Sequence, residues 1–177
     1  MRTRALVMVA VLAGLVASSG LAAAASNAAP AFLHGRSIPL GDVHRYHCDD
    51  LHRGAIRCFT GAAARDRDVA RQEQLLRGPV VGGGGGGAAI ASVAYVTFYV
   101  DQNYGGSSFT ASNTYSNLGD IGWNDTITSF KSLNGGHPEW WVDINFSGTV
   151  WQWVAGAQVA NVGSSANDRF SSVQNVP

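Results

Sequence analysis

Two segments of the chain follow one pattern: YVDQNYGG at residues 99–106 and WVDINFSG at residues 141–148. They begin 42 residues apart and share the same spacing of two aromatic residues and a glycine. A glycine at this point of a tight hairpin permits positive φ or a close backbone approach, which other residues accommodate poorly. The shared positions are therefore predicted to shape two equivalent hairpins: Tyr99, Tyr104, Gly106, Trp141, Phe146 and Gly148.

A second motif follows each hairpin about twenty residues later: NDTITS at residues 124–129 and NDRFSS at residues 167–172. Taken singly, Asn, Asp and Ser in such loops often only build turns. The ordered pair of motifs occurs twice, however, and a repeat at this period indicates one supersecondary unit used twice. Alternating segments rich in β-branched and aromatic residues around 94–100, 140–146 and 149–154 predict short antiparallel strands, and hence a sandwich.

The combined pattern, aromatic-x4-aromatic-x-Gly followed by Asn/Asp-Asn/Asp-x-x-Ser/Thr-Ser, resembles the signature of the βγ-crystallin superfamily. The resemblance covers about residues 94–176, within an expected domain of residues 88–177. It implies an all-β fold in which two four-stranded Greek-key motifs pack as one sandwich. It also implies calcium binding, because microbial members of the superfamily are commonly calcium binders.

The two loop motifs offer oxygen ligands and no nitrogen or sulfur ligand, which suits a hard cation such as Ca²⁺. By analogy with the family, two Ca²⁺ sites would form where the loops run side by side, with a backbone carbonyl supplied by the third loop position. Few carboxylates per site predict a dissociation constant of about 10⁻⁶ to 10⁻⁴ M, and a charge at position 169 is expected to weaken its site. The expected ligands are Asn124, Asp125, Thr126, Thr128, Ser129, Asn167, Asp168, Arg169, Ser171 and Ser172.

Residues 1–25 are typical of an export signal. Two arginines precede an apolar run from residue 5 to residue 21, and three alanines at residues 23–25 offer a cleavage site. The mature protein is therefore expected to be secreted and to have no membrane partner after cleavage. Calcium is plentiful and disulfides persist in that compartment.

The charge of the chain is unevenly distributed. Residues 88–177 carry two basic side chains against six acidic ones, a net charge of −4. A negative domain argues against a nucleic-acid partner, which would require a basic face. The same charge favours a cation as the partner.

Residues 26–81 are expected to be a low-order segment rich in arginine and histidine, followed by a flexible linker of six glycines at 82–87. A charged helix over residues 65–77 would bury too little apolar surface to be stable alone. Cys48 and Cys58 are the only cysteines and are expected to form a disulfide. A metal site among the neighbouring histidines is the disfavoured alternative, because their spacing fits no established zinc pattern.

No arrangement for catalysis is apparent, because His137 is the only histidine after the glycine run. The protein is therefore not expected to be an enzyme. Two alternatives to calcium binding stay open. One is a secreted peptidase inhibitor with a crystallin fold, with a peptidase as protein partner, although such inhibitors typically carry cysteine pairs that this domain lacks. The other is a structural module that binds no ion.

Overall fold

The computed structural model describes residues 29–52, 54–77 and 93–176. The predicted export signal at 1–25 and the predicted glycine linker at 82–87 lie outside the described residues. Within these described ranges, no helix is both long enough and apolar enough to cross a membrane.

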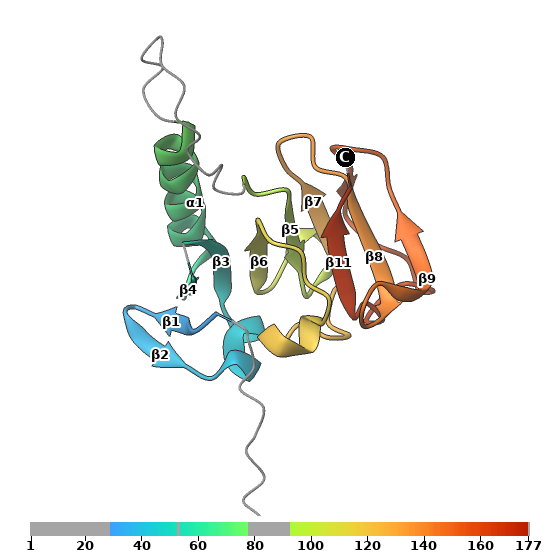
Figure 1. The fold of residues 1–177 in the computed structure, drawn as a ribbon, viewed down its shortest axis with the longest axis horizontal. Helices are drawn as coiled ribbons and strands as arrows, with labels where there is room; N and C mark the ends of the chain where they lie inside the picture. Colours follow the sequence, from blue (N-terminus) through green and yellow to red (C-terminus); the bar gives the residue numbers. More distant parts are fainter. Residues whose placement is uncertain (1–28, 53, 78–92, 177) are drawn as a thin grey trace, which may run out of the picture.

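The strands after residue 93 form two sheets that face each other (Figure 1). One sheet contains the order β10-β7-β5-β6, and the other has the order β11-β8-β9. The strands are β5 (Val96–Tyr99), β6 (Ser108–Ala111), β7 (Ser129–Ser132), β8 (Pro138–Asp143), β9 (Ser147–Gln152), β10 (Gln158–Val159) and β11 (Ser172–Asn175). Short 3-10 helices are η1 (Leu40–Arg45), η2 (Gln102–Tyr104) and η3 (Leu118–Ile121).

Each of the two repeats contributes a segment to the sheet of the other. β10 belongs to the second repeat and pairs with β7 of the first. Tyr115 belongs to the first repeat and forms an isolated bridge with Val173 in β11. This exchange joins two Greek keys into one sandwich, so the predicted all-β crystallin-like fold is confirmed.

Aromatic side chains fill the space between the two sheets. The ring centroid of Phe98 in β5 lies 4.9 Å from that of Trp123 and 5.5 Å from that of Trp140 in β8. Both pairs are edge-to-face, the arrangement that aromatic quadrupoles favour, and all three side chains are completely buried. The aromatic residues that predicted the strands therefore also form the core.

Residues 29–77, called the N-terminal extension below, do not form the low-order segment that composition predicted. They contain β1 (Ala31–Leu33), β2 (Arg36–Ile38), β3 (His47–His52), β4 (Ala55–Phe59) and α1 (Ala62–Arg77). β3 pairs in parallel with β6, which extends the first sheet to eight strands in the order β10-β7-β5-β6-β3-β4-β1-β2. The expectation was wrong because it considered only the apolar content of the segment itself, whereas β6 provides the partner that orders it.

The predicted disulfide is confirmed. Cys48 in β3 and Cys58 in β4 lie directly opposite each other, with their Cα atoms 4.1 Å apart. Closing a loop of this size constrains the unfolded chain by about 2–3 kcal/mol. Because Cys48 is bonded to Cys58, the alternative of a metal site that uses its thiolate is excluded.

A buried carboxylate joins the extension to the crystallin sandwich. Asp50 in β3 is 6% exposed and accepts hydrogen bonds from the backbone N–H groups of Ser112 at 2.6 Å and Asn113 at 3.1 Å. It also accepts from the side-chain amide of Asn113 at 3.0 Å and from the hydroxyl of Tyr115 at 2.7 Å. Burial raises the pKa of Asp50, and these donors act in the opposite direction. The extension and the sandwich therefore share a polar junction as well as a sheet.

Candidate functional site

Both predicted hairpins turn through residues of positive φ. In the first copy φ is 55° at Asn103, 62° at Tyr104 and 68° at Gly106. In the second copy φ is 58° at Asn145, 56° at Phe146 and 76° at Gly148. A Cβ on Gly106 would lie 2.5 Å from Cγ2 of Val100, and one on Gly148 would lie 2.8 Å from Cγ2 of Val142. Both the backbone angle and the close approach therefore require glycine at the last position.

The aromatic positions differ in their surroundings. The rings of Tyr99 and Tyr104 pack edge-to-face with centroids 5.7 Å apart, and the ammonium of Lys131 lies 4.2 Å from the centre of the Tyr104 ring. Trp141 and Phe146 occupy the equivalent positions of the second copy and are half-buried. The aromatic residues thus cover the hairpins rather than fill the central core.

The last serine of each loop motif is bound to its own hairpin. The hydroxyl of Ser129 donates to the carbonyl of Asp101 at 2.5 Å and accepts from the N–H of Tyr104 at 3.1 Å. Ser172 makes the same two bonds in the second copy, at 2.7 and 3.1 Å. Both serines are completely buried, so their hydroxyls fix each hairpin against the loop that follows it.

The two loop motifs lie side by side, in the arrangement that the family resemblance implied. The N–H of Asp125 in the first loop donates to the carbonyl of Phe170 in the second, at 3.1 Å. The N–H of Asp168 in the second loop donates to the carbonyl of Ile127 in the first, at 3.3 Å. Both aspartates have positive φ, 54° and 52°. The pair of loops is thus cross-linked with approximate twofold symmetry.

Several oxygens of the paired loops are not used by the fold. The hydroxyls of Thr128 and Ser171 and the carbonyls of Thr126 and Arg169 make no hydrogen bond with any described residue. In each copy the side-chain amide of the Asn donates to the neighbouring Asp carboxylate at 2.6 Å. These four acidic and amide side chains are exposed or half-buried: Asn124, Asp125, Asn167 and Asp168.

The guanidinium of Arg169 contacts the backbone just before its own loop motif. Its Nη1 donates to the carbonyl of Ser165 at 3.1 Å, and the side chain is exposed. The first copy has the neutral Thr126 at this position, whose hydroxyl donates to the carbonyl of Trp123 at 3.0 Å. The two loops therefore share their backbone path and differ in local charge.

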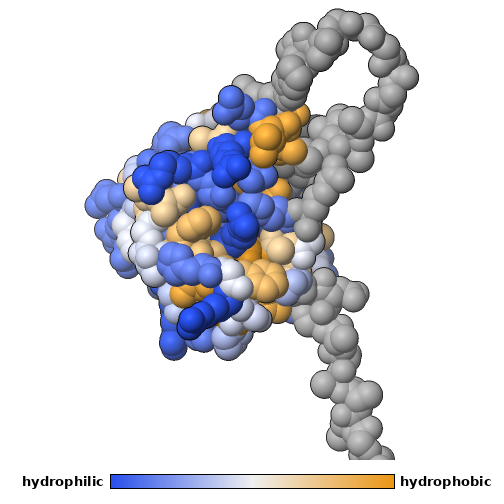
Figure 2. Space-filling view, turned by 90° about the vertical axis from the view of Figure 1, so that its left-hand side faces the viewer, coloured by the Kyte–Doolittle hydropathy of each residue, from blue (hydrophilic) through white to orange (hydrophobic). Residues whose placement is uncertain are grey.

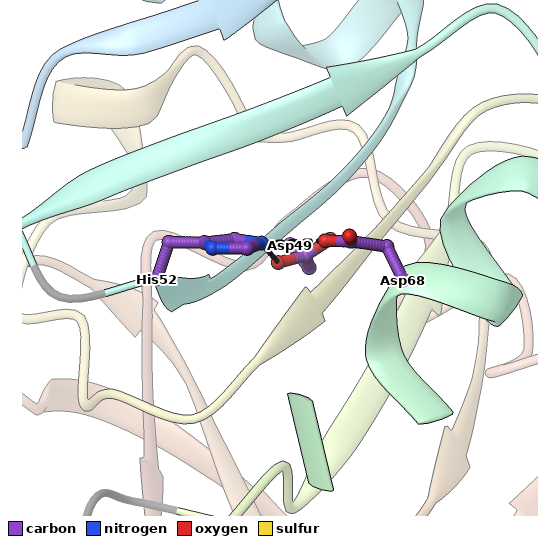
Figure 3. A group of neighbouring side chains, drawn as sticks. All are labelled: Asp49, His52 and Asp68. Atoms are coloured by element: carbon purple, nitrogen blue, oxygen red, sulfur yellow. Dashed lines mark hydrogen bonds and ion pairs between the residues drawn. The ribbon is translucent and has the colours of Figure 1, made fainter. Parts of the chain in front are cut away.

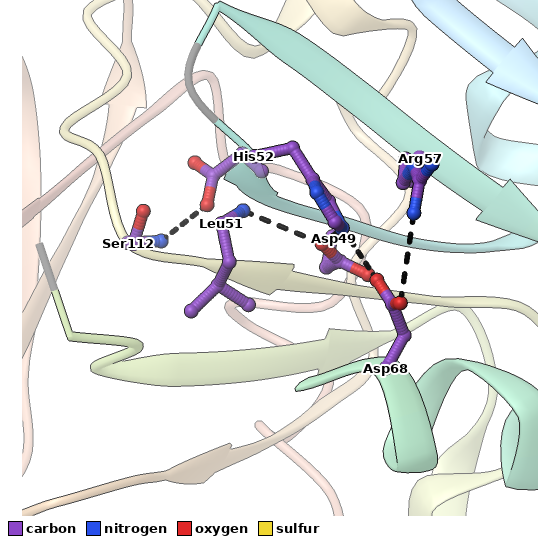
Figure 4. A network of polar contacts seen from close by, with 7 residues as sticks. Asp49, Leu51, His52, Arg57, Asp68 and Ser112 are labelled. Carbon is purple, nitrogen blue, oxygen red and sulfur yellow. Dashed lines mark hydrogen bonds and ion pairs between the residues drawn. The ribbon is translucent and has the colours of Figure 1, made fainter. Parts of the chain in front are cut away.

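A second polar cluster lies in the N-terminal extension, at residues that no motif of the sequence brings together. Asp49 and His52 in β3 and Asp68 in α1 turn toward one another (Figure 3). Nε2 of His52 lies 2.5 Å from Oδ2 of Asp68 and 3.7 Å from Oδ1 of Asp49. Arg57 contacts the other oxygen of Asp68 at 3.7 Å (Figure 4). Asp68 is 16 residues from His52 in sequence, so no local spacing could indicate this cluster.

Comparison with known proteins finds similarity among solved structures. A βγ-crystallin domain from Clostridium beijerinckii is 35% identical to this chain, with a TM-score of 0.41. The alignment spans 46% of this chain and 95% of the clostridial domain. A βγ-crystallin from an archaeon is 29% identical over 47% of this chain, and one from Ciona intestinalis is 26% identical over 46%; both have TM-scores of 0.42 and are covered over 98% of their length.

No model of a protein family matches the chain, and no curated protein matches it either. The assignment therefore rests on sequence identity with the solved domains, which is 35% over nearly the whole clostridial domain. The twofold occurrence of the paired motifs agrees with it. The chain belongs to the βγ-crystallin superfamily.

Proposed function

We propose that this chain is an exported calcium-binding βγ-crystallin protein in which the paired loops hold two Ca²⁺ ions that stabilise the fold. The observation that supports the proposal best is the set of loop oxygens that the fold leaves without partners. Thr128 and Ser171 occupy equivalent positions in two loops that are hydrogen-bonded to each other, and their hydroxyls make no bond with any described residue. Calcium requires six to eight oxygens, and such oxygens in two adjacent loops suit that requirement.

Each ion would take ligands from both loops. The proposed set comprises the hydroxyls of Thr128 and Ser171, the carbonyls of Thr126 and Arg169, and side-chain oxygens of the preceding Asn-Asp pairs. The hydroxyls of Ser129 and Ser172 are already engaged with the hairpins, so their role in the proposal is to hold the loops in place. Because each ion would bind oxygens from both Greek keys, it would stabilise their contact with each other.

Calcium is expected to raise the melting temperature of the full chain. Binding to the folded state alone adds about 2.7 kcal/mol when calcium exceeds its dissociation constant a hundredfold. The double substitution Thr128→Val and Ser171→Ala should abolish most of this shift, because it removes two proposed ligands without breaking any hydrogen bond of the described structure. Calorimetric titration with CaCl₂ and thermal unfolding with and without calcium measure both effects.

The matched control is Thr149→Val with Ser164→Ala, which makes the same chemical changes at exposed positions outside the two loop motifs. This control should bind calcium as the parent does. Equal calcium affinity in the parent and in the loop variant would refute the proposed ligands. Absence of calcium binding in the parent would refute the proposal as a whole and favour a crystallin module that binds no ion.

Replacing Arg169 with threonine is expected to tighten calcium binding by a factor of about 2 to 5 at low ionic strength. The substitution gives the second loop the residue that the first loop has at this position, and it removes an exposed positive charge near the ion. Because salt screens exposed charges, the gain should shrink as NaCl is added. If the increase in calcium affinity does not depend on the salt concentration, the effect of the substitution is not electrostatic.

Export is the remaining part of the proposal, and it is supported by the charged start, apolar run and alanine-rich end of residues 1–25. Mass spectrometry of the protein from the culture medium of a secreting host would measure the mature N-terminus. We expect a chain that begins near Ser26. Retention of residues 1–25 on a cell-associated protein would contradict it.

A further inference from the structure

The helix α1 is held against the sheet mainly by polar contacts. On the side that faces the sheet, Nη1 of Arg65 donates to Oγ1 of Thr110 in β6 at 2.5 Å, and Glu73 accepts from the side-chain amide of Asn134 at 2.8 Å. Leu75 is 65% exposed. Figure 2, which looks onto the side of the molecule that carries α1, shows a largely hydrophilic surface with smaller apolar patches. Apolar burial alone therefore gives this helix little stability.

The Asp49–His52–Asp68 cluster forms a third connection between α1 and the sheet. In the sequence of α1, Asp68 lies between Arg65 and Glu73. One nitrogen or oxygen atom from each residue lies within 4.8 Å of the other two. The two β3 residues and the α1 residue approach from different elements and converge on one small volume (Figures 3 and 4). His52 is 17% exposed and Asp68 is 13% exposed, so the cluster lies at the edge of the buried region and remains accessible to small solutes.

Asp49 provides an independent indication that the cluster receives a ligand. The residue is completely buried, and its Oδ2 has no hydrogen-bond partner among the described residues. Its Oδ1 accepts only one backbone bond, from the N–H of Leu51 at 3.3 Å, and faces Nε2 of His52. A buried carboxylate is costly unless a proton or a cation compensates it.

The charges that surround the cluster favour a cation. Asp49 and Asp68 lie close together. Besides His52, Asp68 forms an ion pair with Arg57 at 3.7 Å, and the Arg57 side chain is 53% exposed. Asp50, the next acid in β3, directs its carboxylate to neutral donors on the sandwich instead. The buried Arg65 also acts on Asp49 through its charge, but its guanidinium is paired with Asp66 at 2.8 Å. The cluster thus combines two carboxylates with one imidazole, and each nearby arginine is either exposed or paired with another acid.

The donor set selects the class of metal. The imidazole nitrogen favours zinc or a related divalent transition metal, whereas calcium takes oxygen ligands only. Zinc also accepts carboxylate oxygens as ligands. The neighbouring contacts also fit, because ligating carboxylates in metal sites are usually held by further hydrogen bonds or charges. Here Leu51 contacts Asp49, and Arg57 contacts Asp68.

We propose that Asp49, His52 and Asp68 bind one Zn²⁺-type divalent ion that fastens helix α1 to strand β3. The site lies in the N-terminal extension and shares no residue with the two loop motifs. The proposal of a zinc site therefore does not depend on calcium binding. A metal held by residues from both elements would stabilise the docked helix, because the ligands are brought together only when the chain is folded.

The test is a calorimetric titration of the full chain with ZnCl₂ at saturating calcium, so that the loops do not compete for the added ion. One equivalent of zinc should bind, and Co²⁺ in its place should give the intense visible absorption of a four-coordinate site. His52→Asn and Asp68→Asn should each weaken zinc binding roughly 100-fold or more, since even residues next to metal ligands change affinity by about 10- to 100-fold.

The matched control is His34→Asn, which removes an exposed histidine at a backbone position of positive φ that asparagine tolerates. Its zinc affinity should equal that of the parent. If His52→Asn prevents folding, the ¹⁵N resonance of His52 Nε2 in the parent still decides the question, because zinc ligation should shift it. Absence of zinc binding in the parent, or equal affinity in the parent and Asp68→Asn, would overturn the proposal and leave a His–Asp contact that binds no metal.

Discussion

Replacing Asp50 with alanine is expected to destabilise the full chain by about 3–5 kcal/mol. The carboxylate is buried and accepts four hydrogen bonds from Ser112, Asn113 and Tyr115 on the sandwich side of the junction. Alanine removes all four acceptor contacts at once, and a buried donor left without an acceptor costs about 1–3 kcal/mol. Urea unfolding monitored by tryptophan fluorescence measures the loss as a lower midpoint.

Asp42→Ala is the control for this substitution. Asp42 also lies in the extension, but its side chain is 36% exposed and makes one ion pair, with Arg45 at 3.4 Å. An exposed pair of this kind contributes at most about 1 kcal/mol. Equal urea midpoints for Asp50→Ala and the parent would show that the hydrogen bonds of Asp50 contribute nothing to stability.

Replacing Gly148 with valine is expected to lower the free energy of unfolding by about 2–6 kcal/mol. A positive φ of 76° disfavours any β-branched residue, by about 1–3 kcal/mol. The added side chain would also push against Val142 and Asp143, and such overpacking costs a further 1–3 kcal/mol, approximately. Thermal unfolding at fixed calcium gives the combined effect, and Gly106→Val should behave in the same way.

Gly156→Val separates the two causes. Gly156 has nearly the same φ, 75°, but an added Cβ would meet no atom within 4 Å. Its cost should therefore be limited to the backbone part, about 1–3 kcal/mol. If Gly148→Val is no more destabilising than Gly156→Val, the hairpin does not require a close approach at that glycine.

The sandwich could be predicted from sequence because its signals are local and repeated. The spacing from Tyr99 to Gly106 recurs from Trp141 to Gly148, and both glycines show the positive φ that this spacing suggested. The pairing of the two loop motifs was implied only by the family resemblance. The loops are joined by bonds between Asp125 and Phe170 and between Asp168 and Ile127, residues too far apart in sequence for local spacing to indicate the contacts.

The N-terminal extension could not be predicted, for physical reasons that its own residues show. β3 reads HCDDLH, which lacks alternating polarity, yet both of its aspartates are buried. The partners of Asp50 lie on the sandwich, and Asp49 faces a cluster that includes Asp68 on the helix. Neither environment can be inferred from β3 alone, whose polarity predicts a solvated segment. The spacing of the histidines around Cys48 fits no zinc pattern, so the sequence disfavours a metal site there. The contact of His52 with Asp68 involves a separate helix, which local spacing does not reveal.

The parallel pairing of β3 with β6 also affects the order in which the chain completes its fold. His47 and Ser108 are hydrogen-bonded across 61 residues, whereas Cys48 and Cys58 are separated by 10. The disulfide joins two residues that lie close in sequence, so after export it can close while β3 still has one open edge. Contacts of such long sequence separation form late and slowly. Until β6 pairs with it, the open edge of β3 is therefore the part of the folding chain that must be kept from pairing with other strands.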